Sequence, residues 1–425
     1  MASVMHSISP LSRWIACTLL ALAATAAFAH EGHDHGAMAG KAAAAKPQLA
    51  TTAAFDKAGR LWVTWAEGQH VVVASSSDLG KTLSKPQRVN PQPEPIYADG
   101  ENRPKVIVSP DGALYISWSR PLDAPYTGFV RFSRSLDGGQ TWSAPATVHQ
   151  DRQPITHRFD SIAVDSAGRI FVTWIDKRDL LRAQSAKQPY DGAAVYYTVS
   201  TDRGATFAPE RKVIDQTCEC CRIALAPDAD GHMLALWRNV FAGQIRDHAL
   251  TTLPVDNTPL YITRATFSEW RVDACPHHGP ALAVTADGVR HMAWFSVMQN
   301  NPGLFYSRLS ADGKPIGETW AFAGSAQANA QASHPALLAA DGALWLVWKQ
   351  FADDRMQILL RKSTDGGAYW TAPASVASTD GGNDHPQLLA HDGHVYLSWR
   401  TQAEGYRLID VTDAVPANAA LEASQ

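Results

Sequence analysis

The sequence predicts an all-β protein, a single propeller of seven four-stranded blades, with six blades as the alternative. A short apolar strand, a Gly turn and an aromatic-rich strand ending in Trp recur seven times. The seven Trp residues are Trp65, Trp118, Trp174, Trp237, Trp294, Trp348 and Trp399. Their spacings lie between 51 and 63 residues. A period near fifty with several strands per unit is typical of propellers.

The first segment, residues 1–29, predicts a secretory signal peptide. Arg13 supplies a positive charge, residues 15–27 are apolar, and Ala27, Phe28 and Ala29 form a small-x-small cleavage site. The apolar stretch is too short to span a membrane, and no longer one follows. We therefore expect an exported protein without a transmembrane segment, periplasmic or secreted from a bacterium.

Cleavage after Ala29 leaves a His-rich segment, residues 30–46, at the new N-terminus. It contains His30, His33 and His35. Imidazole groups in this pattern suit copper, nickel or zinc. The segment therefore predicts metal capture, with a polar tail that binds nothing as the alternative and a flexible tether at its end.

Composition restricts the remaining functions. The formal net charge is −4 and the pI is about 6.5, which does not suggest binding to nucleic acid or an anionic membrane. Length alone would allow several domains, but the repeats join residues 47–411 into one propeller, with a tail over 412–425. We expect a monomer without a nucleotide cofactor, with a periplasmic protein as a candidate partner.

The sixth repeat shows the expected order of strands. Residues 335–338 predict the innermost strand, 343–348 the second, 357–361 the third and 374–377 the outer one. The seventh repeat lacks an evident outer strand. Either the tail from Thr412 onward or the residues near Lys46 would have to supply it and close the ring.

The turn before the outer strand resembles a known motif. In the second repeat it contains Ser135, Asp137, Gly139, Thr141 and Trp142, which resembles the Asp-box, or BNR repeat, of sialidase-like propellers. The equivalent aspartates of other repeats are Asp78, Asp202 and Asp365. The carboxylate accepts backbone N–H bonds within the turn, and the Gly adopts a positive φ. The resemblance implies a propeller fold, with these turns on the face away from the usual binding site.

The innermost strands of a propeller all begin on one face, around the central channel. His or Cys occurs at this level in five successive repeats, as His157, Cys218, Cys220, Cys221, Cys275, His277, His278, His334 and His385. Scattered surface residues would not recur in this way, so we predict a transition-metal site there, with copper favoured and zinc second. The expected ligands are His157, His278, His334 and His385 with Cys220 or Cys221. Because adjacent residues of a strand face opposite ways, His277 is the alternate to His278.

The cysteines allow two compatible interpretations. An oxidising compartment favours a disulfide, and Cys218 and Cys275 lie at equivalent points of neighbouring repeats, although Cys220 is an alternative to Cys218. The other interpretation is thiolate ligation of Cu(I) or zinc with His partners.

Arginines recur at the same level. Arg103, Arg158 and Arg222 lie on consecutive repeats and suit a small anionic ligand such as a carboxylate or phosphate. Salt bridges between blades are the structural explanation. Sialidases use three arginines to bind a carboxylate, so the resemblance implies an exo-acting hydrolase of sialic acid or another acidic sugar, with Asp160 as a candidate catalytic group. No Tyr–Glu nucleophile pair is evident in the sequence.

The sequence therefore favours a non-catalytic exported binding protein, with His, Cys and Arg at the channel mouth and a transition metal as its ligand. The acidic-sugar hydrolase is the first alternative, and a protein-interaction scaffold is the second. A Tyr–Glu pair beside the arginines would favour the hydrolase, whereas a mouth plugged by loops would favour the scaffold.

Overall fold

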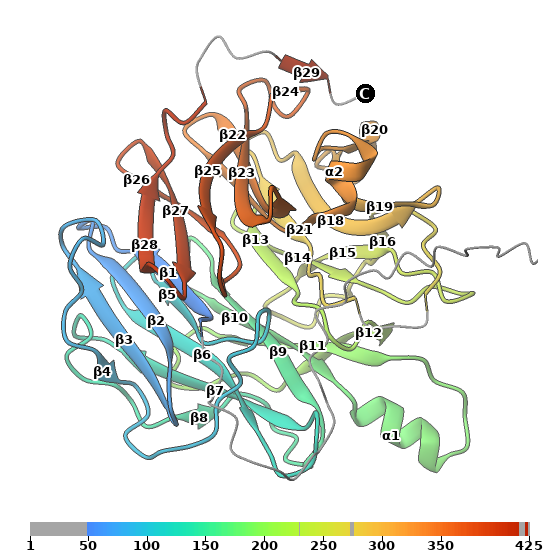
Figure 1. Cartoon of the computed structure of the whole chain (residues 1–425). Helices are drawn as coiled ribbons and strands as arrows, with labels where there is room; N and C mark the ends of the chain where they lie inside the picture. Colours follow the sequence, from blue (N-terminus) through green and yellow to red (C-terminus); the bar gives the residue numbers. More distant parts are fainter. Residues whose placement is uncertain (1–48, 229, 273–275, 416–420, 424–425) are drawn as a thin grey trace, which may run out of the picture. The chain divides into compact units, whose positions relative to one another are not determined.

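The computed structural model describes residues 49–228, 230–272, 276–415 and 421–423. The chain divides into two compact units, residues 1–46 and 47–425, and the described residues all belong to the second. In this unit seven antiparallel sheets follow one another along the chain as the blades of a propeller (Figure 1). The prediction of seven blades is confirmed.

Each of the first four blades has four strands. The first comprises β1 (Thr51–Phe55), β2 (Leu61–Glu67), β3 (His70–Ser76) and β4 (Gln87–Arg88). The second comprises β5 (Lys105–Val108), β6 (Leu114–Pro121), β7 (Gly128–Ser135) and β8 (Ala146–Thr147). The third comprises β9 (His157–Val164), β10 (Ile170–Asp176), β11 (Ala193–Ser200) and β12 (Arg211–Thr217). The fourth comprises β13 (Ala224–Pro227), β14 (Met233–Arg238), β15 (His248–Leu253) and β16 (Thr263–Arg264).

The remaining blades follow the same order. The fifth comprises β17 (Ala281–Val284), β18 (Arg290–Met298), β19 (Asn301–Leu309) and β20 (Pro315–Ala321). The sixth comprises β21 (Ala332–Ala340), β22 (Ala343–Ala352), β23 (Arg355–Ser363) and β25 (Ala374–Thr379). The seventh has three described strands, β26 (Gln387–His391), β27 (His394–Thr401) and β28 (Gly405–Asp410). Two short helices, α1 (Arg178–Ser185) and α2 (Ala326–Ala330), lie in connections, and no described helix could cross a membrane.

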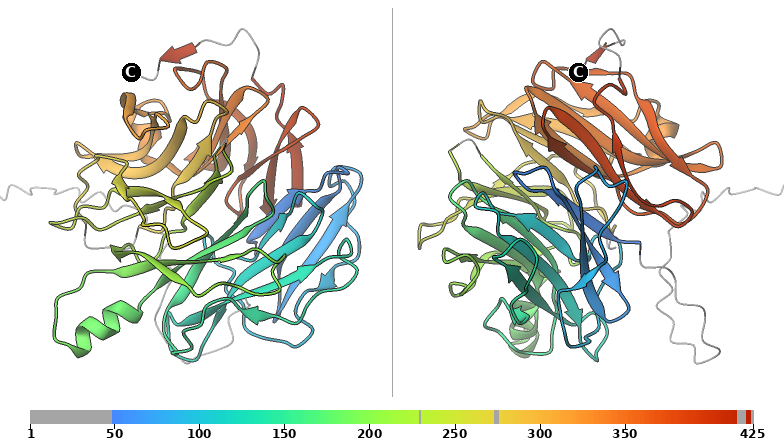
Figure 2. Two further views of the ribbon diagram at one scale, coloured as in Figure 1. Left: turned by 180° about the vertical axis from the view of Figure 1, so that it is seen from behind. Right: turned by 90° about the vertical axis from the view of Figure 1, so that its left-hand side faces the viewer.

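The blades form a closed ring (Figure 2). The innermost strands contact one another in the order β1, β5, β9, β13, β17, β21 and β26, and β26 contacts β1 again. Side chains join the two ends: the Thr51 amide and hydroxyl donate to the Asp384 carboxylate at 2.7 and 2.9 Å. Gln387 in turn exchanges two hydrogen bonds with the backbone of Ala53. Trp65 and Trp399 therefore belong to neighbouring blades.

The C-terminal tail does not complete the seventh blade. Its strand β29 (Leu421–Ala423) pairs with β24 (Tyr369–Thr371), beside the sixth blade's Asp-box. The expectation that the tail supplies the missing outer strand is therefore wrong for the described residues. Lys46, the other candidate, lies outside them.

The recurrent Trp residues fill the spaces between blades. Six of the seven are at most 1% exposed, and Trp65 is half-buried. The indole N–H groups of the six fully buried rings have partners, as in the bond from Trp174 to Asp176 and that from Trp348 to Gln350. Burial of a large ring with its one donor satisfied explains why the residue recurs once per blade.

The Asp-box turns form at the opposite end of the strands from the channel mouth. The Asp137 carboxylate accepts bonds from the Ser135 hydroxyl and from both the amide and the hydroxyl of Thr141, at 2.5–2.9 Å. The same bonds recur at Asp78 and Asp202, and Asp365 keeps those from Ser363 and the following backbone. Bonds from Thr141 above all lower the pKa of Asp137 to about 2.

Glycine in these turns allows each box to touch the preceding blade. Gly139 has a φ of 80°, and a Cβ there would meet the Trp62 ring at 2.6 Å. The equivalent Gly204 would meet Phe132 at the same distance. The boxes thus serve interblade packing, as the sequence suggests.

Candidate functional site

Strand register defines one ring of residues at the channel mouth. On every second strand, the residue before Trp pairs with a residue near the start of the innermost strand. Two positions before that partner, the seven blades place Ala50, Arg103, Phe159, Arg222, Gly279, His334 and His385. We call these seven residues the channel ring.

Two of the ring residues sit in bulges. The pairing shifts between Ser333 and Ala336, where His334 has a φ of 50°, and an equivalent shift in the third blade gives Phe159 a φ of 54°. A bulge re-aims a side chain relative to the regular strand. His334 and His385 occupy equivalent positions of neighbouring blades, and their rings stack with centroids 3.6 Å apart.

A carboxylate from the second blade reaches across the mouth. Glu101 accepts two hydrogen bonds from Arg222 of the fourth blade, at 2.8 and 2.7 Å. It also accepts longer ones, each 3.4 Å, from the Gly279 amide and His334 Nδ1. A Cβ at Gly279 would lie 2.3 Å from the Arg222 side chain, so the fifth blade must present glycine there.

The surroundings keep Glu101 ionised. Burial alone would raise the pKa of its carboxyl, but the Arg222 guanidinium and His334 outweigh burial and hold the pKa well below its usual range. Because the carboxylate is already bonded on several sides, it cannot donate a proton as a general acid at neutral pH.

Three imidazoles gather beside this carboxylate. The His278 ring lies 4.7 Å from that of His334 and stacks on Phe295 at 4.4 Å. Burial, followed by nearby cations and imidazoles, holds the pKa values of His278 and His385 well below the usual range. Burial also lowers the pKa of His334, against the opposing effect of Glu101. All three rings are therefore neutral at pH 7.

Two further pairs of charged groups lie at the mouth. Arg103 contacts Asp384 at 2.7 Å and donates to the Thr51 carbonyl. Asp160, fully buried, accepts bonds from Ser117 and Ser119 and lies 3.6 Å from Lys105. Arg103 and Asp160 therefore form contacts between blades. For Arg103 this agrees with the structural explanation of the recurring arginines, which is salt bridges between blades.

Several predicted residues point elsewhere. His157 is fully buried beside the second blade, stacked on His149 at 4.0 Å and 3.6 Å from Asp176. Arg158 lies over the Tyr97 ring at 4.0 Å. In register, both residues precede the ring position that Phe159 occupies. His277, also off the ring, is exposed.

The cysteines form a separate group. The Cys218 sulfur lies 3.7 Å from that of Cys220 and 3.6 Å from that of Cys221. All three are buried in the core between the third and fourth blades. The expected set of four histidines with a cysteine is thus divided: His278, His334 and His385 come together, and the cysteines do not join them.

Two groups of side chains, one partly exposed and one buried, have the composition of a metal site. One is Glu101, His334 and His385, and the other is the three cysteines; in each, the ligand atoms lie within 4.8 Å of one another. The predicted disulfide partner Cys275, and the predicted ligands His30, His33 and His35, lie outside the described residues.

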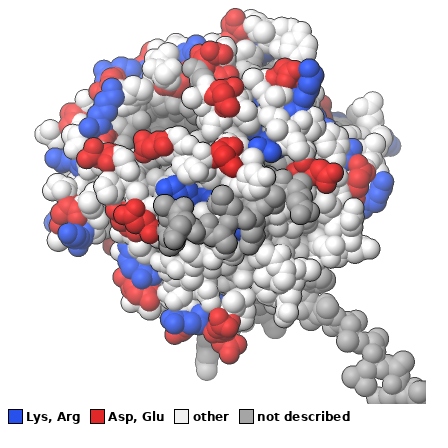
Figure 3. Space-filling view, turned by 90° about the horizontal axis from the view of Figure 1, so that it is seen from above, with Lys and Arg blue, Asp and Glu red and all other residues white. Residues whose placement is uncertain are grey.

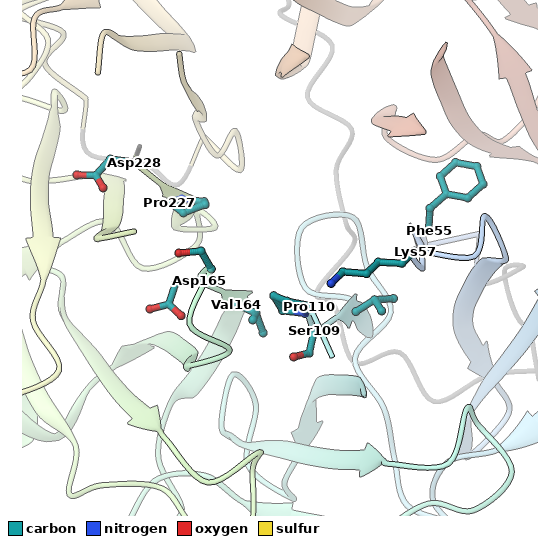
Figure 4. Close-up of a pocket in the computed structure, with 10 residues that line it drawn as sticks. Phe55, Lys57, Ser109, Pro110, Val164, Asp165, Pro227 and Asp228 are labelled. Atoms are coloured by element: carbon teal, nitrogen blue, oxygen red, sulfur yellow. The ribbon is translucent and has the colours of Figure 1, made fainter. Parts of the chain in front are cut away.

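The channel is hollow at the other end. A cavity of about 450 Å³ lies between the far ends of the inner strands (Figure 4), and one of about 320 Å³ continues along them. Asp165 and Asp228 at its edge accept amide bonds of their own turns. Acidic and basic groups are interspersed on the surface in Figure 3.

Sequence reasoning missed the bridging role of Glu101 and the importance of Lys349. Glu101 was noticeable only as an acidic residue in a loop before an inner strand. Lys349 is buried and close enough to lower the pKa values of His334 and His385, to which burial contributes most. In the sequence, the position of Lys349 at the end of a second strand was the one feature that could have indicated its role at the mouth.

No known protein-family profile and no curated protein matches the sequence. Similar solved structures include a PL25 ulvan lyase bound to -[GlcA(1-4)Rha3S]- (11% identity, TM-score 0.51, 84% of this chain and 90% of that one). Polysaccharide lyase Uly1 is another, with 13% identity, a TM-score of 0.51, and 90% of this chain and 92% of that one covered. The Hadza microbial sialidase Hz136 has 13% identity, a TM-score of 0.49, and 85% of this chain and 77% of that one covered. At these identities the likeness concerns the fold. The expectation of a β-propeller with Asp-box turns is confirmed: the chain forms seven blades, and the turns noted in the sequence have the expected hydrogen bonds.

Proposed function

We propose that the protein is a carbohydrate-active propeller whose channel mouth takes a carboxylate-bearing saccharide. The observation that carries this proposal is the group of three neutral, partly exposed histidines surrounded by cations. A neutral imidazole has a lone pair that can take a proton, the cations favour a ligand of negative charge, and a bound carboxylate would in turn favour the protonated imidazole.

The charges near these histidines leave a positive excess. Among the described residues, the cations are Arg103, Lys105, Arg222 and Lys349, and the anions are Glu101, Asp160 and Asp384. Four positive and three negative charges leave an excess of one. A uronate or sialate carboxylate would offset it, which supports an acidic sugar over a neutral one.

The same groups support elimination better than hydrolysis. Glycoside hydrolysis uses two carboxyl groups, one of them protonated, whereas Glu101 stays ionised and Asp160 is enclosed by Ser117 and Ser119. In β-elimination from a uronate, an imidazole accepts the C5 proton, the C4–O bond breaks, and a C4–C5 double bond forms. The leaving oxygen takes a proton from water. Cations beside the carboxylate stabilise the charge that develops.

His385 is the best candidate for the base. Its imidazole belongs to the channel ring and is partly exposed. Exposed aromatic rings at the mouth end add platforms on which sugars stack: Phe267 is 57% exposed and Phe351 48%. The ulvan lyase of similar fold carries a GlcA-containing oligosaccharide, which agrees with the choice of an acidic sugar.

The experiment is an assay for unsaturated products with a panel of uronate polysaccharides, beside a fluorogenic sialoside. We expect product absorbance from at least one uronate polymer, little sialoside hydrolysis, and a loss of about 100-fold or more in His385→Ala. His394→Ala is the matched control, because His394 is exposed and pairs with Asp410 away from the mouth. Sialoside turnover that requires Arg222 would instead establish the hydrolase.

A transition metal at the mouth is the second candidate. The ligand atoms of Glu101, His334 and His385 lie within 4.8 Å of one another, and copper or zinc suits two imidazoles and a carboxylate. Glu101 would have to give up one bond to Arg222. Copper and zinc titration of wild type, a deletion of residues 30–38 and the His334→Ala, His385→Ala double variant tests this. If the deletion alone abolishes binding, the mouth holds no metal.

Export to the periplasm is part of the same proposal. It rests on the signal-like features of residues 1–29, which lie outside the described residues. N-terminal sequencing of the protein from a periplasmic fraction, with His30 expected first, tests it.

A further inference from the structure

Three buried sulfur atoms meet in the loop between β12 and β13. Cys218, Cys220 and Cys221 are each at most 4% exposed. Given their separations, one point lies roughly 2.1–2.4 Å from all three sulfurs, and a zinc–sulfur bond is about 2.3 Å long. Disulfide sulfurs would be about 2.0 Å apart, so the arrangement suits an ion between the sulfurs better than a bond within the group.

A buried cation lies beside this group. Arg238 is fully buried, and its guanidinium donates to the carbonyls of Arg246, His278 and Phe295. No ion pair joins it to a carboxylate in the part of the chain that the structure describes. Its backbone carbonyl accepts the Cys218 amide at 3.1 Å, so the cation and the thiols belong to one region.

Charge balance connects the two observations. A buried charge without a counter-charge is costly. Three thiolates around Zn²⁺ carry a net charge of about −1, and around Cu(I) about −2, because each ligating thiol is deprotonated. Either centre would supply the negative charge that Arg238 lacks among the described residues.

We propose that Cys218, Cys220 and Cys221 bind one thiophilic d10 cation, Zn²⁺ or Cu(I), as a three-thiolate centre between the third and fourth blades. The site is independent of the proposed saccharide chemistry. It has a structural consequence for the mouth, since Arg222 directly follows Cys221 and a metal would fix the backbone from which Arg222 reaches Glu101.

Cobalt substitution tests the proposal on the full chain, prepared reduced and without an affinity tag. We expect one equivalent of Co²⁺ to give thiolate-to-cobalt charge-transfer absorption, which the His-rich N-terminus cannot produce. Zn²⁺ or Cu(I) should displace it, and elemental analysis of the protein as isolated identifies the native metal. Cys221→Ser should weaken binding at least ten-fold, whereas the triple Ser variant should lose the band and His334→Ala should keep it.

A second measurement needs no variant. Bound metal should protect all three cysteines of wild type from alkylation, and a chelator should expose them, as located by peptide mass spectrometry. Absence of the cobalt band in wild type, a band that survives in the triple variant, or a native disulfide from any of the three, including one to Cys275, would overturn the proposal.

Discussion

The two ends of this propeller use the repeat in different ways. At the Asp-box end, Ser76, Ser135 and Ser200 each donate the same bond to the aspartate two residues later, at 2.6–2.8 Å. At the mouth, equivalent positions of successive blades carry arginine, phenylalanine, arginine, glycine and histidine. Repetition at one end forms similar interblade contacts at the four boxes, whereas variation at the other end brings unlike groups around one axis. Functional residues are therefore expected at the mouth, where equivalent positions of the repeat carry different side chains.

Among the variants that test this difference between the two ends, Glu101→Ala should have the largest effect on stability and binding. Removing the carboxylate leaves Arg222, a quarter exposed, without its ion-pair partner, and we expect the free energy of unfolding to fall by about 3 kcal/mol. Saccharide binding should fall as well, because the mouth loses its bridge. Urea unfolding together with calorimetric titration measures both. An unchanged unfolding midpoint would mean that the ion pair between Glu101 and Arg222 does not stabilise the fold.

Acid should affect the mouth before the Asp-box end. The pKa values of His278 and His385 are lowered chiefly by burial, so below pH 6.5 the unfolded state binds protons that the folded state does not. Stability is then complete above pH 6.5 and falls by about 1.4 kcal/mol per pH unit for each such histidine.

Box carboxylates lose their contribution only as pH falls below about 4, the ordinary aspartate value, toward the pKa of about 2 that Asp137 has in the fold. Urea unfolding at several pH values measures both effects. His385→Gln should reduce the loss between pH 6.5 and 4.5 by one histidine's share, since other buried histidines such as His278 and His291 also have lowered pKa values, and Asp137→Ala should leave that range unchanged. If Asp137→Ala changed the loss in this pH range and His385→Gln did not, the mouth would not be the more acid-sensitive end.

The smallest effect should come from Asp137→Ala. The turn loses the bonds from Ser135 and Thr141, so the thermal midpoint should fall while saccharide binding stays unchanged. Asp312→Ala is the control, since the fifth repeat keeps only a remnant of the box, with Asp312 exposed, and should shift the midpoint less. Weaker binding at an unchanged midpoint would place function at the Asp-box end.

Local patterns predicted the fold because Trp, the Gly turns and the boxes each act within one or two blades. The mouth was predicted only in part. His334 and His385 were found because the Pro after each marks an equivalent point of the repeat. His157 lies two residues before the ring position, a displacement that only register reveals. Contacts such as Glu101 to Arg222, 121 residues apart, depend on the size of the closed ring, which local spacing does not specify.

Ring closure has a consequence for how the chain reaches this fold. The bond from Thr51 to Asp384 joins residues 333 positions apart, so the first blade lacks one neighbour until the seventh exists. Non-local contacts of this kind slow folding and leave strand edges exposed meanwhile. The chain would therefore close its ring in one late step. Refolding rates of a circularly permuted chain, opened between two other blades, would measure how strongly that step governs the rate.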